Sequence, residues 1–290
     1  QEAYRLAYIR KPEFMGNTRT EEKDPKFKVI SDLPWCEQEI NERLAAYRQL
    51  SDKVEQEWHA LPAQKKETYF QLVKYPVQAA AQMNNKLLTA QLARHGKADW
   101  ADSDRAYDSI VSLTKTYNTT KWNRMMDFQP RRLLVFNRVE RKALSSGLLE
   151  KPQAVYTWNG ADCVEGASVI CEGLGYEGKA VAVEKKKELT FEFAAWETDS
   201  VEVEVRLLPN HPVEGERLRF TISLDGSATE AVSYETKGRS EEWKENVLCN
   251  QAVRRMILPV ARKASHRLIF TALDEGVVLD QICLYMPRIK

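Results

Sequence analysis

The densest group of side chains suited to binding a polar ligand lies in residues 117–126. Eight consecutive residues supply two amides, two cations and two aromatic rings, in the order Tyr117, Asn118, Thr119, Thr120, Lys121, Trp122, Asn123 and Arg124. Such a set can line a polar pocket, and its substrate-binding candidates are Lys121, Trp122, Asn123 and Arg124. The alternative is a helix end at which the Asn side chains cap the backbone and the following methionines pack.

Tryptophan rings are a second feature that can bind a ligand, because sugar rings stack on aromatic faces. The C-terminal half carries Trp158, Trp196 and Trp243. Tryptophan is also a frequent core residue, so packing is the competing interpretation for each of them. Trp158 is the best candidate for a substrate contact, since Asn159-Gly160 directly after it indicates a turn and hence an exposed loop.

Signatures of nucleotide binding and of nucleophilic catalysis are missing from the sequence. The string GLGYEG at 173–178 lacks the Lys-Ser/Thr ending of a phosphate-binding loop, so we expect its glycines to form a turn. A glycosidase needs two carboxylates about 5–10 Å apart. Spacing alone cannot select such a pair from 42 acidic residues. We therefore assign no catalytic residue and expect no cofactor.

The cysteines and histidines give no metal-binding pattern. None of the five cysteines forms a CxxC pair, and the four histidines flank none of them. An odd number of cysteines argues against a full disulfide framework. A single bridge between Cys163 and Cys171 is left open beside the alternative of five free thiols.

Helical periodicity dominates the first half of the chain. We expect a leading helix at about 2–10, a long loop over 16–30 and a bundle over 33–128. Pro62 should open a helix, Pro76 should kink or restart one, and Gly96 should end one. Asp102 or Ser103 is expected to cap the next helix. Asn84 lies on an apolar helix face, so it should join two helices or face a neighbouring domain.

The second half alternates with a period of two residues. Apolar side chains occupy every other position in runs such as Val201-Val203-Val205 and Leu218-Phe220-Ile222-Leu224, and no helical period intervenes. Glu202, Glu204 and Arg206 should face away from the core. We predict an α+β multidomain fold in which a helical bundle precedes an antiparallel, jelly-roll-like β-sandwich. The predicted segments are 1–32 (leading helix and loop), 33–128 (bundle), 129–152 (connection) and 153–290 (sandwich).

Composition supports this division and excludes several functional classes. Residues 1–150 contain ten Gln and three Gly, whereas residues 151–290 contain three Gln and nine Gly. The net charge of +1 disfavours a nucleic-acid partner. The longest uncharged stretch has 11 residues, too short for a transmembrane helix, and the first ten residues do not form a signal peptide. Because the chain begins with Gln1, we expect it to be a processed protein or part of a longer one.

Two strings resemble the helical domain of glycoside hydrolase family 115, the xylan α-1,2-glucuronidases. They are LVKYPVQAAAQMNNKLLTAQLARHGKADW (72–100) and YNTTKWNRMMDFQPR (117–131). The first string has a Tyr-Pro pair and then an Ala-rich helix with Met-Asn, and the second has a Lys-Trp-Asn ahead of Met-Met. These features follow one another in the family's order. The terminal β-sandwich of that family is similar to LGYEGKAV (174–181), RLLPNHP (206–212), LRFTISLDG (218–226), EEWKENVLCN (241–250) and HRLIFTALDEGVVLDQI (266–282).

The resemblance implies a non-catalytic role for this chain. Catalysis in the family is associated with an α/β-barrel that precedes the helical domain, and no βα repeat occurs here. The chain would support the barrel of a parent enzyme that removes (4-O-methyl-)glucuronic acid from xylan outside the cytoplasm, periplasmic or secreted. Lys121 and Arg124 would meet the uronate carboxylate. Thr119-Thr120 replace glycines that family members often carry there, which changes how closely the backbone can approach a substrate.

Two alternatives of another class stay open at this point. The sandwich could be a carbohydrate-binding module for xylan-type glycans, with its tryptophans as the binding surface. The helical part could instead be a dimerisation module, with a second copy of the chain as its partner.

Overall fold

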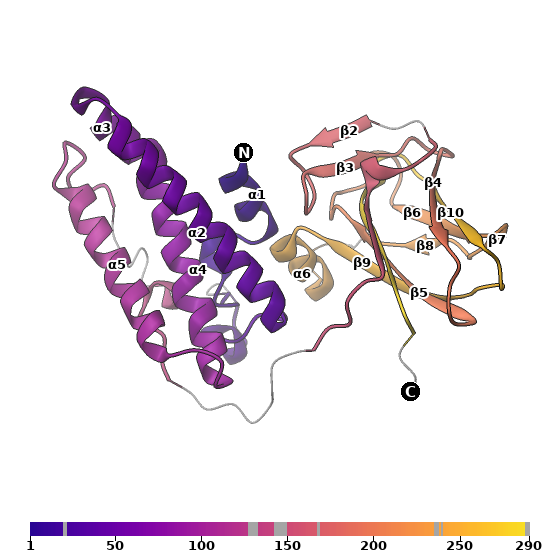
Figure 1. Ribbon diagram of the computed structural model, residues 1–290, viewed down its shortest axis with the longest axis horizontal. Helices are drawn as coiled ribbons and strands as arrows, with labels where there is room; N and C mark the ends of the chain where they lie inside the picture. Colours follow the sequence, from indigo (N-terminus) through magenta and orange to yellow (C-terminus); the bar gives the residue numbers. More distant parts are fainter. Residues whose placement is uncertain are drawn as a thin grey trace. The chain divides into compact units, whose positions relative to one another are not determined.

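The computed structural model describes residues 1–19, 22–126, 133–141, 150–166, 169–234, 238 and 240–287 (Figure 1). The chain divides into two compact units. The helical unit comprises Glu2 and Arg10–Lys151, and the sandwich unit comprises Gln1, Ala3–Ile9 and Pro152–Lys290. The predicted α+β fold, helices first and antiparallel strands second, is confirmed. Nearly all of helix α1 (Glu2–Ile9) groups with the sandwich, so the predicted segment 1–32 is divided between the units.

Three long helices form the centre of the helical unit, namely α2 (Glu37–Ala60), α4 (Tyr75–Arg94) and α5 (Trp100–Asn118). They run alongside one another, and α4 contacts both of the others (Figure 1). The core residues come mainly from α4, with partners from α2 and α5, and include Ile40, Met83, Leu87, Leu88, Ala90, Leu92 and Ile110. Short 3-10 turns lie at Pro12–Phe14, Pro25–Lys28 and Leu134–Phe136.

Proline and glycine set the helix boundaries largely as expected. Pro62 directly precedes helix α3 (Ala63–Tyr69), and a π-helical turn over Phe70–Lys74 leads into α4. Pro76 lies in the first turn of α4, where a missing backbone N–H costs little. Gly96, with a φ of 72°, ends that helix as predicted.

The predicted cap of the following helix was wrong. Asp99 caps α5, and its carboxylate accepts the Ala101 N–H at 2.9 Å. Ser103 is instead buried against α4, where its hydroxyl donates to the Lys86 carbonyl at 2.7 Å. The helix therefore starts three residues ahead of the predicted capping position at Asp102.

The predicted connection over 129–152 is described only in part. Residues 129–132 and 142–149 lie outside the described residues. Val135 and Val139, from the described stretch between them, are buried in the core of the helical unit. Residues 133–141 are therefore packed against the bundle rather than forming a free linker.

Two antiparallel sheets form the sandwich among the described residues. The first has the order β2-β3-β11-β5-β9, with β1 also pairing with β11, and the second has the order β4-β10-β6-β7, with β8 pairing with β6. The bounds in the first sheet are β1 (Tyr156–Asn159), β2 (Val169–Glu172), β3 (Lys179–Ala182), β5 (Ser200–Leu207), β9 (Ala252–Pro259) and β11 (Val278–Tyr285). Those in the second are β4 (Glu188–Ala194), β6 (Arg219–Leu224), β7 (Ser227–Ala228), β8 (Val232–Ser233) and β10 (Ser265–Ala272).

The alternating residues predicted from the sequence make one shared core. Val201, Val203 and Val205 from the first sheet pack in the same cluster as Phe191, Phe220 and Phe270 from the second. Each of these side chains is at most 1% exposed. Burying one face of each sheet in this way is what holds two antiparallel sheets together.

One helix of the sandwich unit was missed. The expectation that no helix interrupts the strands was wrong, because α6 (Glu241–Cys249) precedes β9. Ser240 caps it by accepting the Trp243 N–H at 3.1 Å, and Asn250 ends it in a left-handed conformation with a φ of 50°. At nine residues it is too short for its apolar period to stand out. None of the described helices is both long and apolar enough to cross a lipid bilayer.

Candidate functional site

The predicted substrate-binding residues lie at one end of the helical unit, beside an aromatic cluster. Phe70, Tyr75 and Tyr117 are buried there, and the Tyr75 and Tyr117 ring centres are 4.6 Å apart. The Tyr75 hydroxyl lies 3.1 Å from the Thr114 hydroxyl, and burial raises the Tyr75 pKa. Trp58 and Trp122 pack against this cluster from its partly exposed side.

The turn after α5 presents the four predicted residues in different ways. Lys121, Asn123 and Arg124 are exposed, whereas Trp122 is half-buried against the aromatic cluster. The Lys121 backbone N–H donates to the Glu67 carboxylate at 3.3 Å, and its ammonium group lies 5.2 Å from the centre of the Trp122 ring. Arg124 has a φ of 65°, which turns the chain sharply.

Two further lysines lie over the same aromatic surface. The ammonium groups of Lys74 and Lys66 are 4.6 Å and 5.3 Å from the Trp58 ring centre. Lys74 also pairs with Glu55 at 2.7 Å, and this hydrogen bond is the main cause of the lowered Glu55 pKa. Such cations can offer charge-assisted hydrogen bonds to a carboxylate ligand. We define Lys66, Lys74, Lys121, Trp122 and Arg124 as the bundle-end surface.

The structure does not place Trp158 in an exposed loop. It lies in β1, opposite Ile282 of β11, and is half-buried. Its ring stacks on Tyr156 with 5.2 Å between the centres and also contacts Phe191 at 5.7 Å. The turn indicated by Asn159-Gly160 begins only after the strand, as a 3-10 turn over Gly160–Asp162.

The other two tryptophans do not extend Trp158 into a flat binding surface. Trp196 is buried and its indole N–H donates to the Ser200 carbonyl at 2.9 Å. Trp243 is half-buried in α6, and its ring stacks on His211 with 6.4 Å between the centres. None of the three rings is fully exposed, so the feature that motivated a carbohydrate-binding module on the sandwich is weakened.

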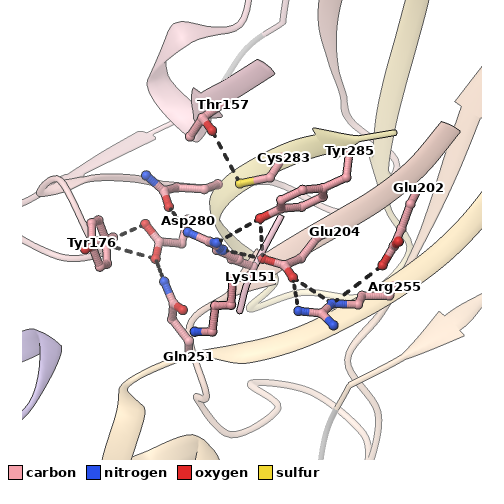
Figure 2. A network of polar contacts seen from close by, with 12 residues as sticks. Lys151, Thr157, Tyr176, Glu202, Glu204, Gln251, Arg255, Asp280, Cys283 and Tyr285 are labelled. Atoms are coloured by element: carbon pink, nitrogen blue, oxygen red, sulfur yellow. Dashed lines mark hydrogen bonds and ion pairs between the residues drawn. The ribbon is translucent and has the colours of Figure 1, made fainter. Parts of the chain in front are cut away.

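A network of charged side chains covers the outer face of the first sheet (Figure 2). Glu204 is 3% exposed, and its carboxylate accepts one hydrogen bond of 2.7 Å from Arg206 and another of 2.7 Å from Arg255. Burial alone would raise the Glu204 pKa, but the two guanidinium groups lower it overall. Arg206 also donates to Gln281 at 2.8 Å. Strand alternation correctly predicted that Glu204 and Arg206 face away from the core.

Asp280 is the most enclosed carboxylate of this network. A bulge between Leu279 and Gln281 in β11 accommodates it, and its side chain is fully buried. It accepts the Tyr176 N–H at 2.9 Å and the Gln251 amide at 2.9 Å, and burial raises its pKa. Figure 2 shows Tyr176 and Gln251 converging on this carboxylate.

The glycine string over 173–178 explains how a backbone can approach Asp280 so closely. It forms the turn between β2 and β3, as expected, and Gly175 has a φ of 88°. A Cβ atom on Gly175 would lie 2.2 Å from the nearer Asp280 oxygen. Sequence reasoning missed this site because its partners are 104 and 29 residues from Asp280 in the chain.

The chemistry available at these two places differs. The sandwich network pairs its buried carboxylates with donors, so it suits positioning better than acid–base catalysis. Within the part of the chain that the structure describes, no group of three or more His, Cys, Asp or Glu side chains could hold a metal ion. All five cysteines are free, so the bridge between Cys163 and Cys171 is not formed. The bundle-end surface is the better candidate for contacting a ligand.

Comparison with known proteins gives a strong similarity to one enzyme family. Residues 167–290 match the family model described as Glycosyl hydrolase family 115 C-terminal domain. The chain is 61% identical, with a TM-score of 0.95, to a solved family GH115 4-O-methyl-α-glucuronidase, BtGH115A, described as having specificity for decorated arabinogalactans. The alignment covers 98% of this chain and 38% of that one, so this chain spans well under half the length of its relative.

Other solved structures are only weakly similar to this chain. A carbohydrate-binding module from Cellvibrio mixtus lichenase 5A, in complex with cellotriose, is 13% identical with a TM-score of 0.35, covering 47% of this chain and 100% of that one. A family 35 carbohydrate-binding module from an environmental isolate is 10% identical with a TM-score of 0.37, covering 46% of this chain and 93% of that one. A comparison with curated proteins gives no match.

Proposed function

Since this chain belongs to glycoside hydrolase family 115 and corresponds to the C-terminal region of its members, we propose that it is the non-catalytic part of a (4-O-methyl-)α-glucuronidase. Its partner is then the catalytic domain of the parent protein, which it supports. The observation that carries this proposal is 61% identity over 98% of the chain, combined with coverage of only 38% of the relative.

The parent protein would act on polysaccharides that carry glucuronic acid. The resemblance of the sequence favours xylan, whereas the solved relative is described as specific for decorated arabinogalactans. Both backbones present the same uronic acid, so we propose the uronate as the recognised group. Polymers of this size do not cross a membrane unaided, which supports a periplasmic or secreted location.

The direct test is an activity comparison. We expect the purified chain to release no uronic acid from glucuronoxylan or from decorated arabinogalactan, whereas the full-length parent releases it from at least one of them. Ion-exchange chromatography of the products measures the release. Release of uronic acid by the isolated chain would contradict a non-catalytic role. Failure of the parent on both polymers would contradict the proposed substrate class.

We further propose that the bundle-end surface contributes to uronate binding in the parent enzyme. The support comes from the exposed ammonium group of Lys121 beside Trp122 and from the exposed guanidinium of Arg124. A charge-assisted hydrogen bond is worth about 1.5–3 kcal/mol, so K121M should lower kcat/KM about tenfold or more. Trp158 is not included, because its ring is occupied by Tyr156 and Phe191.

The matched control for this variant is K115M. Lys115 is exposed in the last turn of α5, the helix that precedes Lys121, but lies outside the bundle-end surface, and we expect K115M to keep the parental kcat/KM. A substrate whose uronate is methyl-esterified should remove most of the difference between K121M and the parent. An equal loss on the acid and on the ester would show that Lys121 acts on folding rather than on the carboxylate.

A further inference from the structure

Helix α1 makes side-chain contacts with parts of the sandwich unit that lie far from it in sequence. The Asn250 side-chain amide donates to the Tyr8 carbonyl, across 242 residues. Arg5 donates to the Tyr176 carbonyl at 3.2 Å and approaches the Glu177 carboxylate at 3.9 Å. On the same helix, Leu6 is only 2% exposed.

The Asn250 side chain pairs with a backbone carbonyl at the C-terminus of α1. The last four carbonyls of an α-helix have no partner within the helix. Tyr8 belongs to the last turn of α1, so the Asn250 amide supplies one of the missing donors. Asn250 is itself the left-handed residue that ends α6. One residue therefore terminates α6 with its backbone and caps α1 with its side chain.

Asp280 fixes the turn against which α1 lies. Its carboxylate holds the Tyr176 N–H, and the Tyr176 carbonyl in turn accepts from Arg5. Burial is the main cause that raises the pKa of Tyr8 to about 12, the negative charge of Asp280 adds to the shift, and a backbone hydrogen bond with Gly175 opposes it. The half-buried Tyr8 phenol therefore lies near Gly175 and Asp280.

We propose that the sandwich unit carries a specific binding surface for helix α1, formed by the 173–178 turn and Asn250 and held in shape by Asp280 as a positioning residue. The functional sandwich thus includes residues 3–9 together with the region from β1 onward, whereas the matched family model begins only at residue 167. By holding α1, this surface also fixes the point on the sandwich at which the chain continues from Ile9 to Arg10. This inference does not depend on the glucuronidase assignment.

Hydrogen–deuterium exchange of the full chain tests this proposal. In N250G the α1 carbonyl loses its donor, and we expect the α1 amides to exchange about five- to tenfold faster, as for the loss of one hydrogen bond. Glycine adopts the left-handed conformation of Asn250 without strain. K186G is the matched control, because Lys186 has a φ of 65° and is exposed, and its α1 exchange should equal that of the wild type.

A second pair of variants covers the case in which N250G unfolds the sandwich. Y8F removes a hydroxyl that lies near the Gly175 backbone on a half-buried side chain, whereas Y4F makes the same change one turn earlier on a side chain that is 83% exposed. We expect faster α1 exchange in Y8F only, with the β10 amides protected in both. Equal α1 exchange in Y8F and Y4F, or unprotected α1 amides in the wild type, would overturn the proposal.

Discussion

Lys86 places an amino group inside the helical unit, where its side chain is fully buried. Its Nζ atom donates to the Val135 carbonyl at 2.6 Å and to the Asn137 carbonyl at 2.8 Å. Both acceptors belong to the stretch that packs against the bundle, so Lys86 ties that stretch to α4. Burial lowers the Lys86 pKa from 10.5 to about 7.

This depressed pKa predicts that stability rises with pH. Between pH 7 and about 10 the unfolded chain keeps a proton that the folded chain has released, so raising the pH favours the folded state, by at most about 1.4 kcal/mol per pH unit. K86M removes this dependence and the two hydrogen bonds that the Lys86 Nζ atom donates. We expect its deficit in unfolding free energy to widen between pH 7 and pH 9.

Chemical denaturation at pH 7, 8 and 9 measures this deficit, with K115M as the control on an exposed lysine. K115M should follow the wild type at every pH. A deficit of K86M that stays constant or narrows as the pH rises would contradict the depressed pKa.

At the scale of elements, Asn84 joins α2 to α4. Its carbonyl oxygen accepts from the Arg43 guanidinium at 2.7 Å, and its amide donates to the Ala80 carbonyl at 2.8 Å. The prediction that this buried Asn connects two helices is confirmed. Apolar periodicity allowed that prediction, because a polar side chain on a buried face must find a partner.

N84A should therefore weaken the pairing of α2 with α4. The guanidinium of Arg43, only 6% exposed, would lose its Asn84 acceptor, and we expect a loss of about 2–3 kcal/mol in unfolding free energy. N85A is the matched control, since Asn85 is half-buried one position further along α4. Urea denaturation followed by circular dichroism at the helical band compares them. A loss in N84A no larger than that in N85A would refute the role given to this contact.

Elements with a strong period were predictable from the sequence, and contacts between distant segments were not. The Val201-Val203-Val205 alternation gave β5, because one face of an antiparallel strand is buried. The Asp99 cap was missed because Asp102 and Ser103 offer similar capping side chains shortly after it, and α6 was missed because nine residues are too few for a clear apolar period. Asp280 could not be identified as a buried, multiply bonded carboxylate, because the bulge that accommodates it has no signature in the sequence.

At the scale of the whole molecule, two separate cores imply two separable unfolding events. G175A should affect the sandwich strongly, since its Cβ atom would lie 2.2 Å from the Asp280 carboxylate. G173A is the matched control in the same turn, with a φ of 80° and no atom within 4 Å of its added Cβ. The control should cost only the conformational penalty of about 1–2 kcal/mol.

Differential scanning calorimetry resolves these effects. We expect G175A to lower the melting temperature of the sandwich by several degrees more than G173A does, and neither to move the transition of the helical unit. A single transition that shifts as a whole in G175A would show that the two cores unfold together. Equal shifts in both variants would show that Asp280 does not require the close approach of the backbone.

The assignment of α1 to the sandwich has a consequence for gene architecture. The codons for the sandwich unit lie on both sides of those for the helical unit, as when one gene is inserted into another. A single recombination junction near the codon for Pro152 would therefore transfer an incomplete sandwich to a new host gene. Two junctions, one on each side of the helical insert, are needed to exchange either body intact, so the pair should be inherited as one cassette.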